Sequence, residues 1–453
     1  MTSRLFLARA LAILTGVGAL HVVACSSSNE PAPHDEAPEG TEAGAEASVP
    51  RDGDAGLGDA DADADADLPP PTYDFGVQCT AAPCVTQLAA RGGSHACAVF
   101  QDRTVRCWGS NASGQLGTGE SDGGASPAFD AKPRAVGGLP DAASVAATGD
   151  GVSGTTCVVA TSGEVWCFGS DARGLLGRGG ATSTAPHPEP MAVAGLAAKS
   201  VVLADTFALA MGTDGRLWSW GSNDLLQLAR YPGEASANPT APTYAGRIMV
   251  PVRSVAGTSK NGFVVTDDGS VLSWGGAVDS QLARASSLDA DAVPAPVAVS
   301  DITSITTGAA HVCALSRGGG VFCWGDNAHG QLGIGTKGSQ RFPAPVLLPD
   351  GVQAVAVIAG GDDTCIIAAS GDLHCWGANG SGQIATAAGD QLRPRRIEGL
   401  GEQVISAAIM DGSICALRRG GSVECWGDNL VGQLGRGTRD SEIHVEPGPI
   451  VIE

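Results

Sequence analysis

Cysteine and histidine side chains stand close together between residues 311 and 329, where they could do chemistry. His311 precedes Cys313, Cys323 follows ten residues later, and His329 comes after it. Zinc prefers thiolate and imidazole ligands, and Cys₂His₂ sites occur with several spacings. Two cysteines at this separation could equally form a disulfide. The spacing leaves both interpretations open, so the rest of the chain must decide between them.

The same stretch recurs seven times along the chain. The fifth copy reads WGDNAHGQLG, and the offset from its first residue to the glutamine position is the same in every copy. Successive copies lie 50 to 60 residues apart. A fixed period of this length indicates a repeat architecture. The copies begin at Trp108, Phe168, Trp220, Trp274, Trp324, Trp376 and Trp426.

Five cysteine pairs share the ten-residue step, whereas the histidines do not accompany them. Thr155, Asp363 and Ser413 stand in three copies where His311 stands in the fifth. The third and fourth copies lack both cysteines together, as expected for a bond between two partners. Cysteines that face one another across antiparallel strands lie within disulfide reach. We therefore predict disulfides and no metal, in the pairs Cys97–Cys107, Cys157–Cys167, Cys313–Cys323, Cys365–Cys375 and Cys415–Cys425, with Cys79–Cys84 as a sixth.

Each repeat reads as four short strands, for example 343–348, 354–359, 364–369 and 373–377. The last two form a hairpin with glycine at the position of its loop that requires a left-handed backbone, and only Arg103 in the first copy departs from this. Seven such units predict an all-β, seven-bladed β-propeller. The first unit lacks a proline-flanked opening strand. We expect residues 443–453 to supply it and so to close the ring.

The recurring aromatic residues are predicted to pack between blades, because side chains alternate between the two faces of a strand. The glutamine of the Gly-Gln-Leu-Gly turn is expected to bond backbone of the next blade. His95 and His311 are interpreted as hydrogen-bonded structural histidines.

The N-terminus has the pattern of an export signal. An apolar run follows Arg4 and Arg9 and ends in Val22-Val23-Ala24-Cys25, which resembles the cleavage box of bacterial lipoproteins. That resemblance implies a signal peptide over 1–24 and acylation of Cys25. The alternative is ordinary secretion with a free thiol at Cys25. Export would also provide the oxidising compartment that disulfides need.

Residues 25–74 are predicted to be a disordered linker ahead of a propeller over 75–453. Fourteen acidic residues and one arginine lie between Glu30 and Asp74, including DADADADAD. The alternating aspartates do not match an EF-hand loop, so calcium is not expected. The whole chain carries a formal charge of −21. A chain this acidic is not expected to bind nucleic acid.

The hairpin followed by WGxNxxGQLGxG resembles the repeat of the regulator-of-chromosome-condensation (RCC1-like) propellers, over residues 77–453. The resemblance implies a seven-bladed propeller. It also points to two functions. The founding member is a nucleotide-exchange factor for a small GTPase and itself binds chromatin, whereas other members are protein-binding domains.

No catalytic constellation or cofactor motif accompanies the repeats. We expect a monomeric, non-catalytic protein-binding or scaffolding module, lipid-anchored in the bacterial cell envelope, at the outer membrane and facing the periplasm or the surface. The alternatives are an exchange-factor-like regulator, or an enzyme with aspartates from several blades gathered in the central channel.

Two adjacent loops are basic in an otherwise acidic domain. The fifth carries Lys337 and Arg341, and the sixth carries Arg393, Arg395 and Arg396. These residues are the candidate binding site for an acidic protein partner. The alternatives are scattered solvated charge and docking of the chain's own acidic linker.

Overall fold

The computed structural model describes residues 73–80, 82–119, 127–151, 153–231, 241–277, 280–285, 288–384, 389–401 and 403–452. The predicted signal peptide, Cys25 and nearly all of the predicted linker lie outside these residues. Within the described ranges, no helix has the length and apolar character needed to span a bilayer.

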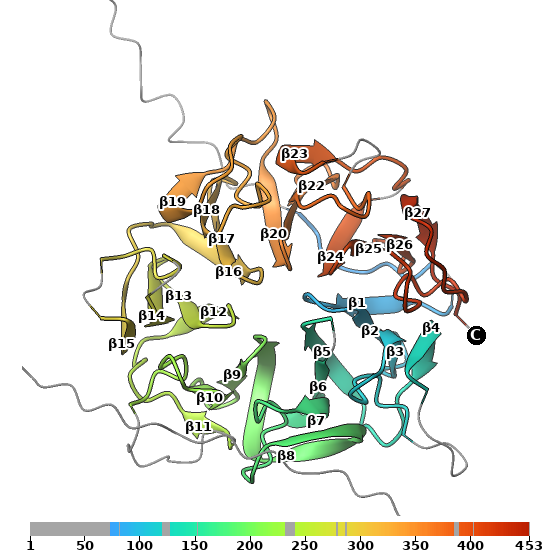
Figure 1. Ribbon diagram of the computed structural model, residues 1–453, viewed down its shortest axis with the longest axis horizontal. Helices are drawn as coiled ribbons and strands as arrows, with labels where there is room; N and C mark the ends of the chain where they lie inside the picture. The colour runs from blue at the N-terminus through green and yellow to red at the C-terminus, as the bar shows by residue number, and fades with distance from the viewer. Residues whose placement is uncertain are drawn as a thin grey trace, which may run out of the picture. The chain divides into compact units, whose positions relative to one another are not determined.

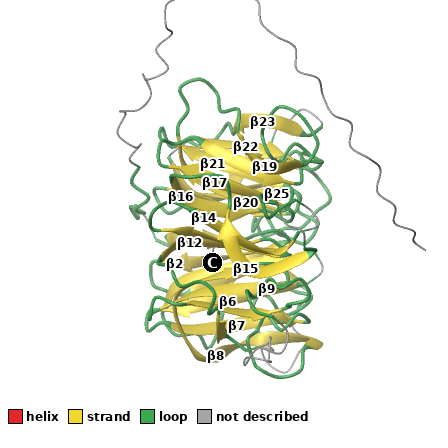
Figure 2. Cartoon of the chain, turned by 90° about the vertical axis from the view of Figure 1, so that its left-hand side faces the viewer, coloured by secondary structure: helices red, strands yellow, loops and turns green. Residues whose placement is uncertain are grey.

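The described residues form a ring of seven antiparallel blades, as predicted (Figure 1). Five blades are separate four-stranded sheets. The second and third share one seven-stranded sheet, because β8 (Ser183–Leu203) pairs with β7 through its first part and with β9 through its second. Figure 2 shows the blades from the side, with their strands stacked across the ring.

Each blade runs outward from the central axis in sequence order. The strands of blades 1 to 3 are β1 (Val85–Ala89), β2 (His95–Phe100), β3 (Val105–Ser110), β4 (Phe129–Ala135), β5 (Ala142–Gly149), β6 (Gly154–Ala160), β7 (Glu164–Asp171), β8, β9 (Phe207–Gly212), β10 (Leu217–Gly221) and β11 (Thr243–Tyr244). Those of blades 4 and 5 are β12 (Val252–Gly257), β13 (Asn261–Thr266), β14 (Val271–Gly276), β15 (Ala290–Pro296), β16 (Ile302–Thr307), β17 (His311–Ser316), β18 (Val321–Gly325) and β19 (Gln340–Pro345). Those of blades 6 and 7 are β20 (Ala354–Gly360), β21 (Asp363–Ala368), β22 (Leu373–Gly377), β23 (Gln391–Arg396), β24 (Val404–Met410), β25 (Ser413–Arg418), β26 (Val423–Gly427) and β27 (His444–Pro449).

The predicted place of the proline-flanked strand was wrong. It is the outermost strand of its own blade and not the first strand of the next one, as the pairing of β19 with β18 shows. The C-terminal strand likewise pairs with β26 of blade 7, not with blade 1. Proline suits this outer position because an edge strand has no ladder partner on one side. The prolines also protect the free edges from pairing with other chains.

Repeated contacts between blades close the ring in place of an exchanged strand. The amide of Val85 in blade 1 donates to the carbonyl oxygen of Gly421 in blade 7, at 2.9 Å. The corresponding bond recurs at other seams, for example from Ala354 to Gly319, also at 2.9 Å. Ile450 packs in the apolar cluster between blades 7 and 1. Ring closure therefore uses a hydrogen bond and an apolar cluster of the kind found at other seams, and the segment before β1 adds a bond from the amide of Gln78 to the carbonyl of Arg419.

One apolar cluster fills each of the seven seams. The recurring tryptophans lie in them fully buried, which confirms their predicted packing role. Each tryptophan indole donates to a main-chain carbonyl at the glutamine position of the preceding blade, as from Trp324 to Gln281 and from Trp108 to Gln433. The burial of a polar ring is thus matched by a hydrogen bond.

The hairpins between the second and third strands have the predicted turn chemistry. Gly319 and Gly371 have φ of 83° and 88°, in the region that glycine enters without a steric penalty. Arg103 takes the same conformation at 64°. Because strands alternate in direction, these hairpins lie on one face of the ring, here called the hairpin face. The Gly-Gln-Leu-Gly turns and the turns between first and second strands lie on the other, the glutamine face.

Candidate functional site

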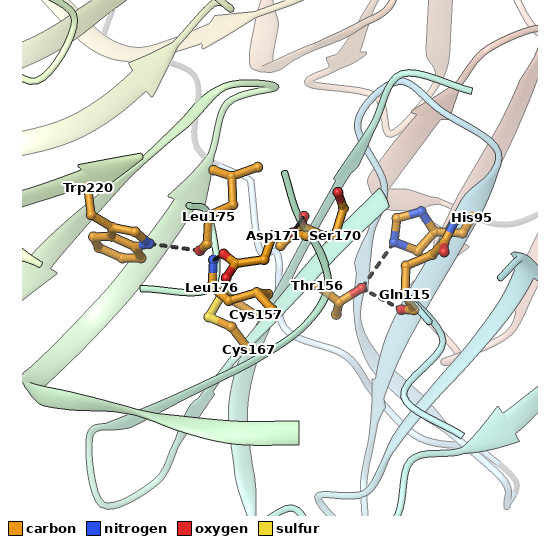
Figure 3. Close-up of a disulfide and its surroundings, with 11 residues drawn as sticks. His95, Gln115, Thr156, Cys157, Cys167, Ser170, Asp171, Leu175, Leu176 and Trp220 are labelled. Carbon is orange, nitrogen blue, oxygen red and sulfur yellow. Dashed lines mark hydrogen bonds between the residues drawn. A yellow bond between two sulfur atoms is a disulfide. The ribbon is translucent and has the colours of Figure 1, made fainter. Parts of the chain in front are cut away.

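The cysteines of all six predicted pairs lie with their sulfur atoms at bonding distance. In the five repeat pairs the partners are directly opposed on the second and third strands, as for Cys157 and Cys167. Figure 3 shows this pair beside the seams that flank blade 2. Among the described residues, no group of three or more His, Cys, Asp or Glu side chains could hold a metal ion. The stretch 311–329 therefore supplies a hairpin crosslink between Cys313 and Cys323.

Buried histidines link neighbouring blades beside these crosslinks. The Nε2 atom of His95 lies 3.0 Å from Oγ1 of Thr156 in blade 2, and that hydroxyl donates to the carbonyl of Gln115 (Figure 3). His311 makes the same contact with Thr364 of blade 6, at 2.7 Å. Burial lowers the pKa of His95 to about 4 and that of His311 to about 3. Both histidines are therefore buried and hydrogen-bonded across a seam between blades, which agrees with their interpretation as hydrogen-bonded structural residues.

The glutamine side chain differs from its prediction. In most copies it folds back on its own turn, where Oε1 of Gln331 accepts the amide of His329 and Nε2 donates to Asp326. Only Gln281 reaches next-blade backbone among the described copies, at Ala310. The main-chain carbonyl at the glutamine position, and not the side chain, accepts the hydrogen bond from the indole of the next blade's tryptophan.

Blades 3 and 4 replace the disulfide with an arginine. In blade 3, Nη1 of the buried Arg230 donates to Oγ of Ser219, at the second cysteine position, at 3.1 Å. In blade 4, Nε of Arg284 lies 3.3 Å from Oγ of Ser273 and the side chain pairs with Asp291. The same two blades also lack the turn glycines, so Leu226, Ala229, Ser280 and Ala283 occupy the left-handed region. Such residues cost about 1–2 kcal/mol each relative to a right-handed backbone.

Arg91 occupies the central axis of the ring and was not singled out from the sequence. It follows β1 of blade 1, and its guanidinium crosses to three other blades. Nη1 donates to the carbonyl of Leu203 at 3.1 Å, Nη2 to that of Gly257 at 2.8 Å, and Nε to that of Thr307 at 2.9 Å. Nη2 also donates to Oγ1 of Thr307 at 3.0 Å and to the carbonyl of Gly308 at 2.9 Å, and Nη1 forms an ion pair with Asp205 at 3.3 Å. Burial lowers the pKa of the guanidinium, and Asp205 offsets part of that effect.

The acceptors of Arg91 are equivalent to Arg91 itself in the repeat. Leu203, Gly257 and Thr307 each stand four residues before the first residue of the second strand, as Arg91 stands four before His95. Carbonyls at this position converge on the axis, and one blade supplies the cation that they share. Aligning the repeats would have revealed Arg91, because the equivalent residues are uncharged.

Aspartates surround the channel mouth on the glutamine face, as the channel-site alternative anticipated. Asp150, Asp205 and Asp411 line a recess of about 160 Å³ beside Arg91. Partial removal from solvent raises the pKa of Asp411 to about 6, and the neighbouring carboxylates, Asp362 among them, add to the rise. The charges repel one another, and the hydroxyls of Ser153 and Thr148 donate to Asp150 and Asp205. Among the described residues, no group of three or more His, Cys, Asp or Glu side chains could hold a metal ion there.

The five predicted partner-binding residues lie on blades 5 and 6. Lys337 is in a loop, whereas Arg341 belongs to β19, and the other three belong to β23. The structure neutralises two of them. Lys337 pairs with Asp390 at 2.6 Å, and Arg396 pairs with Asp372 at 2.8 Å.

The three remaining arginines have no carboxylate partner among the described residues. Two of them lie beside exposed apolar side chains: Arg341 stacks with Phe342, which is 52% exposed, and Arg393 and Leu347, which is 41% exposed, both lie close to Gly335. Arg395 instead lines a recess between the outer strands of blades 6 and 7. Hereafter the basic rim means Arg341, Phe342, Leu347, Arg393 and Arg395. Arginine and aromatic side chains are the residues most enriched at protein interfaces.

Comparison with known proteins places the chain among other propellers. The model of the RCC1-like domain matches residues 51–412. The human E3 ubiquitin-protein ligase HERC2 is 31% identical over 234 residues, which are 49% of this chain but only 5% of HERC2. The ultraviolet-B receptor UVR8 of Arabidopsis thaliana is 25% identical over 323 residues, covering 70% of this chain and 71% of UVR8. This chain thus spans a small part of HERC2 and most of UVR8.

Two solved structures share the fold. Prp20p of Saccharomyces cerevisiae, described with its binding to Gsp1p and histones, has a TM-score of 0.65 at 19% identity, over 82% of this chain and 88% of Prp20p. Human WBSCR16 has a TM-score of 0.66 at 21% identity, over 77% of this chain and 94% of its own. Likeness at this level shows the fold alone. Since the family model spans well over half of the residues, this chain belongs to the RCC1-like domain family.

Proposed function

We propose that the protein is a monomeric, non-catalytic binding or scaffolding module, held at the bacterial cell envelope by an acylated Cys25. The propeller would present its basic rim to an acidic protein partner. No cofactor, metal or nucleic acid is involved in this proposal.

The basic rim is the observation that carries the proposal. Its three arginines have no carboxylate partner among the described residues, and exposed Phe342 and Leu347 lie beside two of them, in a chain whose formal charge is −21. Charges of one sign on a surface of the other steer a complementary partner and set its orientation. Exposed aromatic and aliphatic groups beside them would supply the apolar contact at the centre of an interface.

The occupied axis supports binding at the rim over chemistry in the channel. The guanidinium of Arg91 lies on the axis, bonded to carbonyls on three blades, and the recess beside it has a volume of about 160 Å³. Likeness to Prp20p is at the level of fold, so exchange activity is not proposed.

Anchoring rests on the lipoprotein-like box ending at Cys25. Six cysteine pairs at bonding distance are compatible with export, because disulfides persist in oxidising compartments. Metabolic labelling with an alkyne fatty acid tests this part: label is expected on the wild type and not on Cys25→Ala. Label that survives in Cys25→Ala would contradict it.

Partner capture tests the binding function. Cross-linked complexes are recovered from cell envelopes with the wild type and with the triple variant Arg341→Glu, Arg393→Glu, Arg395→Glu. We expect the variant to lose its specific partners, and the wild type to lose them at high salt, because exposed charge pairs are screened. The matched control reverses three arginines elsewhere, Arg134, Arg253 and Arg317. Equal recovery with both triple variants would overturn the basic rim as the docking site.

A further inference from the structure

A groove separates the outer strands of blades 6 and 7. It has a volume of about 500 Å³, within the range of sites that hold a ligand. Its floor is apolar, formed by Ile384, Ile397, Trp426, Val445 and Pro447. Trp426 is 1% exposed, so only the edge of its ring reaches the groove, whereas Val445 is 37% exposed.

The walls carry opposite charges on two facing edge strands. Arg395 lies on β23, and Glu446 lies on β27. Neither side chain has an ion-pair partner among the described residues. Arg396, which also lines the groove, is already paired with Asp372. Arg395 is therefore the free cation of this groove within the described part of the chain.

The neighbouring seam explains why the groove exists. Ile397 and Val346 are equivalent, since their amides donate to Leu373 and Val321 of the third strands. The next residue is Leu347 in blade 5 and Glu398 in blade 6. In blade 5, Leu347 and the neighbouring blade's Arg393 both lie close to Gly335 and fill the seam.

In the next seam both filling side chains are replaced. Glu446 takes the register position of Arg393. In blade 6, Gly377 pairs with Gln391 and Arg393 comes two residues later, and in blade 7, Gly427 pairs with His444 and Glu446 comes two residues later. Glu398 takes that of the leucine, and Gly399 follows it with no side chain. Among the described residues, the space that Leu347 and Arg393 fill in one seam is thus left as the groove in the other.

We propose that this groove binds an extended segment of a protein partner, with a bulky apolar side chain on the floor and an adjacent carboxylate paired to Arg395. The inference rests on the proposed binding function and specifies the chemistry that the partner presents. An apolar side chain suits a floor of isoleucine, valine and tryptophan edge. A carboxylate suits Arg395 because guanidinium groups bind carboxylates in a two-pronged geometry.

Peptide binding to the full-length protein tests the inference directly. The probe is a fluorescein-labelled synthetic peptide of alternating leucine and aspartate, and its counterpart carries lysine for aspartate. Fluorescence anisotropy should show saturable binding of the acidic peptide and at least about tenfold weaker binding of the lysine peptide. Arg395→Glu should weaken the acidic peptide by about tenfold.

Two further variants separate the groove from general charge. Glu398→Leu introduces the residue of blade 5 and should block binding while the propeller stays folded. Arg134→Glu reverses a charge at the same strand register on blade 1, opposite Cys107 as Arg395 is opposite Cys375. It should bind within about twofold of the wild type, since rim charges elsewhere act mainly on association rate.

The outcomes distinguish this inference from the proposed function. Absence of saturable peptide binding by the wild type, or wild-type affinity in Glu398→Leu or Arg395→Glu, overturns the groove. If envelope partners still depend on the basic rim in that case, the binding function stands without it. If peptide binding is absent and envelope partners also do not depend on the basic rim, both the groove and the proposed binding function are overturned.

Discussion

The guanidinium of Arg91 donates to the carbonyl oxygen of Gly257 across the ring axis, with Nη2 and O 2.8 Å apart. The two residues hold the same position in different repeats. One side chain therefore satisfies several main-chain acceptors that would otherwise meet without donors at the narrowest point of the ring. A buried carbonyl left without a donor costs about 1–3 kcal/mol.

Arg91→Met should consequently lower the free energy of unfolding by about 3 kcal/mol or more, as removal of one partner from a buried charged network does. Urea unfolding followed by tryptophan fluorescence measures it. Arg91→Lys, which keeps the charge but has fewer donors, should lose less. A loss below about 1 kcal/mol in Arg91→Met would show that water replaces the guanidinium.

Arg103 should be a site where glycine stabilises the protein. It holds φ of 64° at a hairpin position where the other blades have glycine. Arg103→Gly is expected to gain about 1 kcal/mol, by relief of the left-handed backbone. Gly215→Ala is the reciprocal test, because a Cβ there meets no atom within 4 Å and only the φ of 80° opposes it. It should lose about 1 kcal/mol. A lower melting temperature for Arg103→Gly, or a higher one for Gly215→Ala, would contradict this reasoning.

Reduction should destabilise the blades unequally. Each crosslinked hairpin closes a short loop, which contributes about 2–3 kcal/mol on the chain-entropy model. Thiol-alkylation mass spectrometry of exported protein should find twelve oxidised cysteines. After reduction, hydrogen exchange should rise in hairpins such as β17–β18 and stay constant in β13–β14, which has no cysteine. Free thiols at Cys313 and Cys323 in the exported protein would refute the crosslinks.

Acid should destabilise the fold through the buried histidines His95 and His311. Their folded pKa values, about 4 for His95 and about 3 for His311, lie below the unfolded value of 6.5. The unfolded chain binds more protons between these limits, so stability is full above pH 6.5 and falls as the pH drops. From pH 7 to 5 each histidine should cost about 2 kcal/mol.

The variant His95→Asn, His311→Asn tests this pH dependence, since blade 4 has Asn261 at the same position. Between pH 7 and 5, its free energy of unfolding should fall by about 4 kcal/mol less than that of the wild type, whatever its stability at pH 7. Each single variant should recover about half of that difference. Parallel stability curves for wild type and double variant would assign the acid sensitivity elsewhere.

Local chemistry made much of the fold predictable. The hairpin glycines, the opposed cysteines and the recurring aromatic residues each report on neighbours within one or two strands. The proline-flanked strand was misplaced because the segments before and after it, such as 334–339 and 346–353, are both short, so spacing could not tell which blade it joins. Its prolines were the better signal, since they disfavour a central position.

Non-local convergence explains what the sequence did not reveal. Arg91 meets carbonyls from Leu203 and Thr307, more than a hundred residues away, only because the ring brings equivalent positions to one axis. The groove beside Arg395 likewise depends on side chains of two blades at once. For the basic residues, composition indicated the region, whereas only the ion pairs separated Lys337 and Arg396 from the others.

The continuous strand β8 has a mechanical consequence. At the other seams between successive blades the chain crosses as a loop, such as 297–301 or 346–353, which can extend under load. The seam between blades 7 and 1 has no chain connection at all and is held by side-chain packing and hydrogen bonds. Between blades 2 and 3 a covalent strand carries the tension directly from Ala197, paired with Glu164, to Ala198, paired with Gly212. A force that opens the ring should therefore separate the blades at another seam first, and blades 2 and 3 should stay together as one mechanical unit.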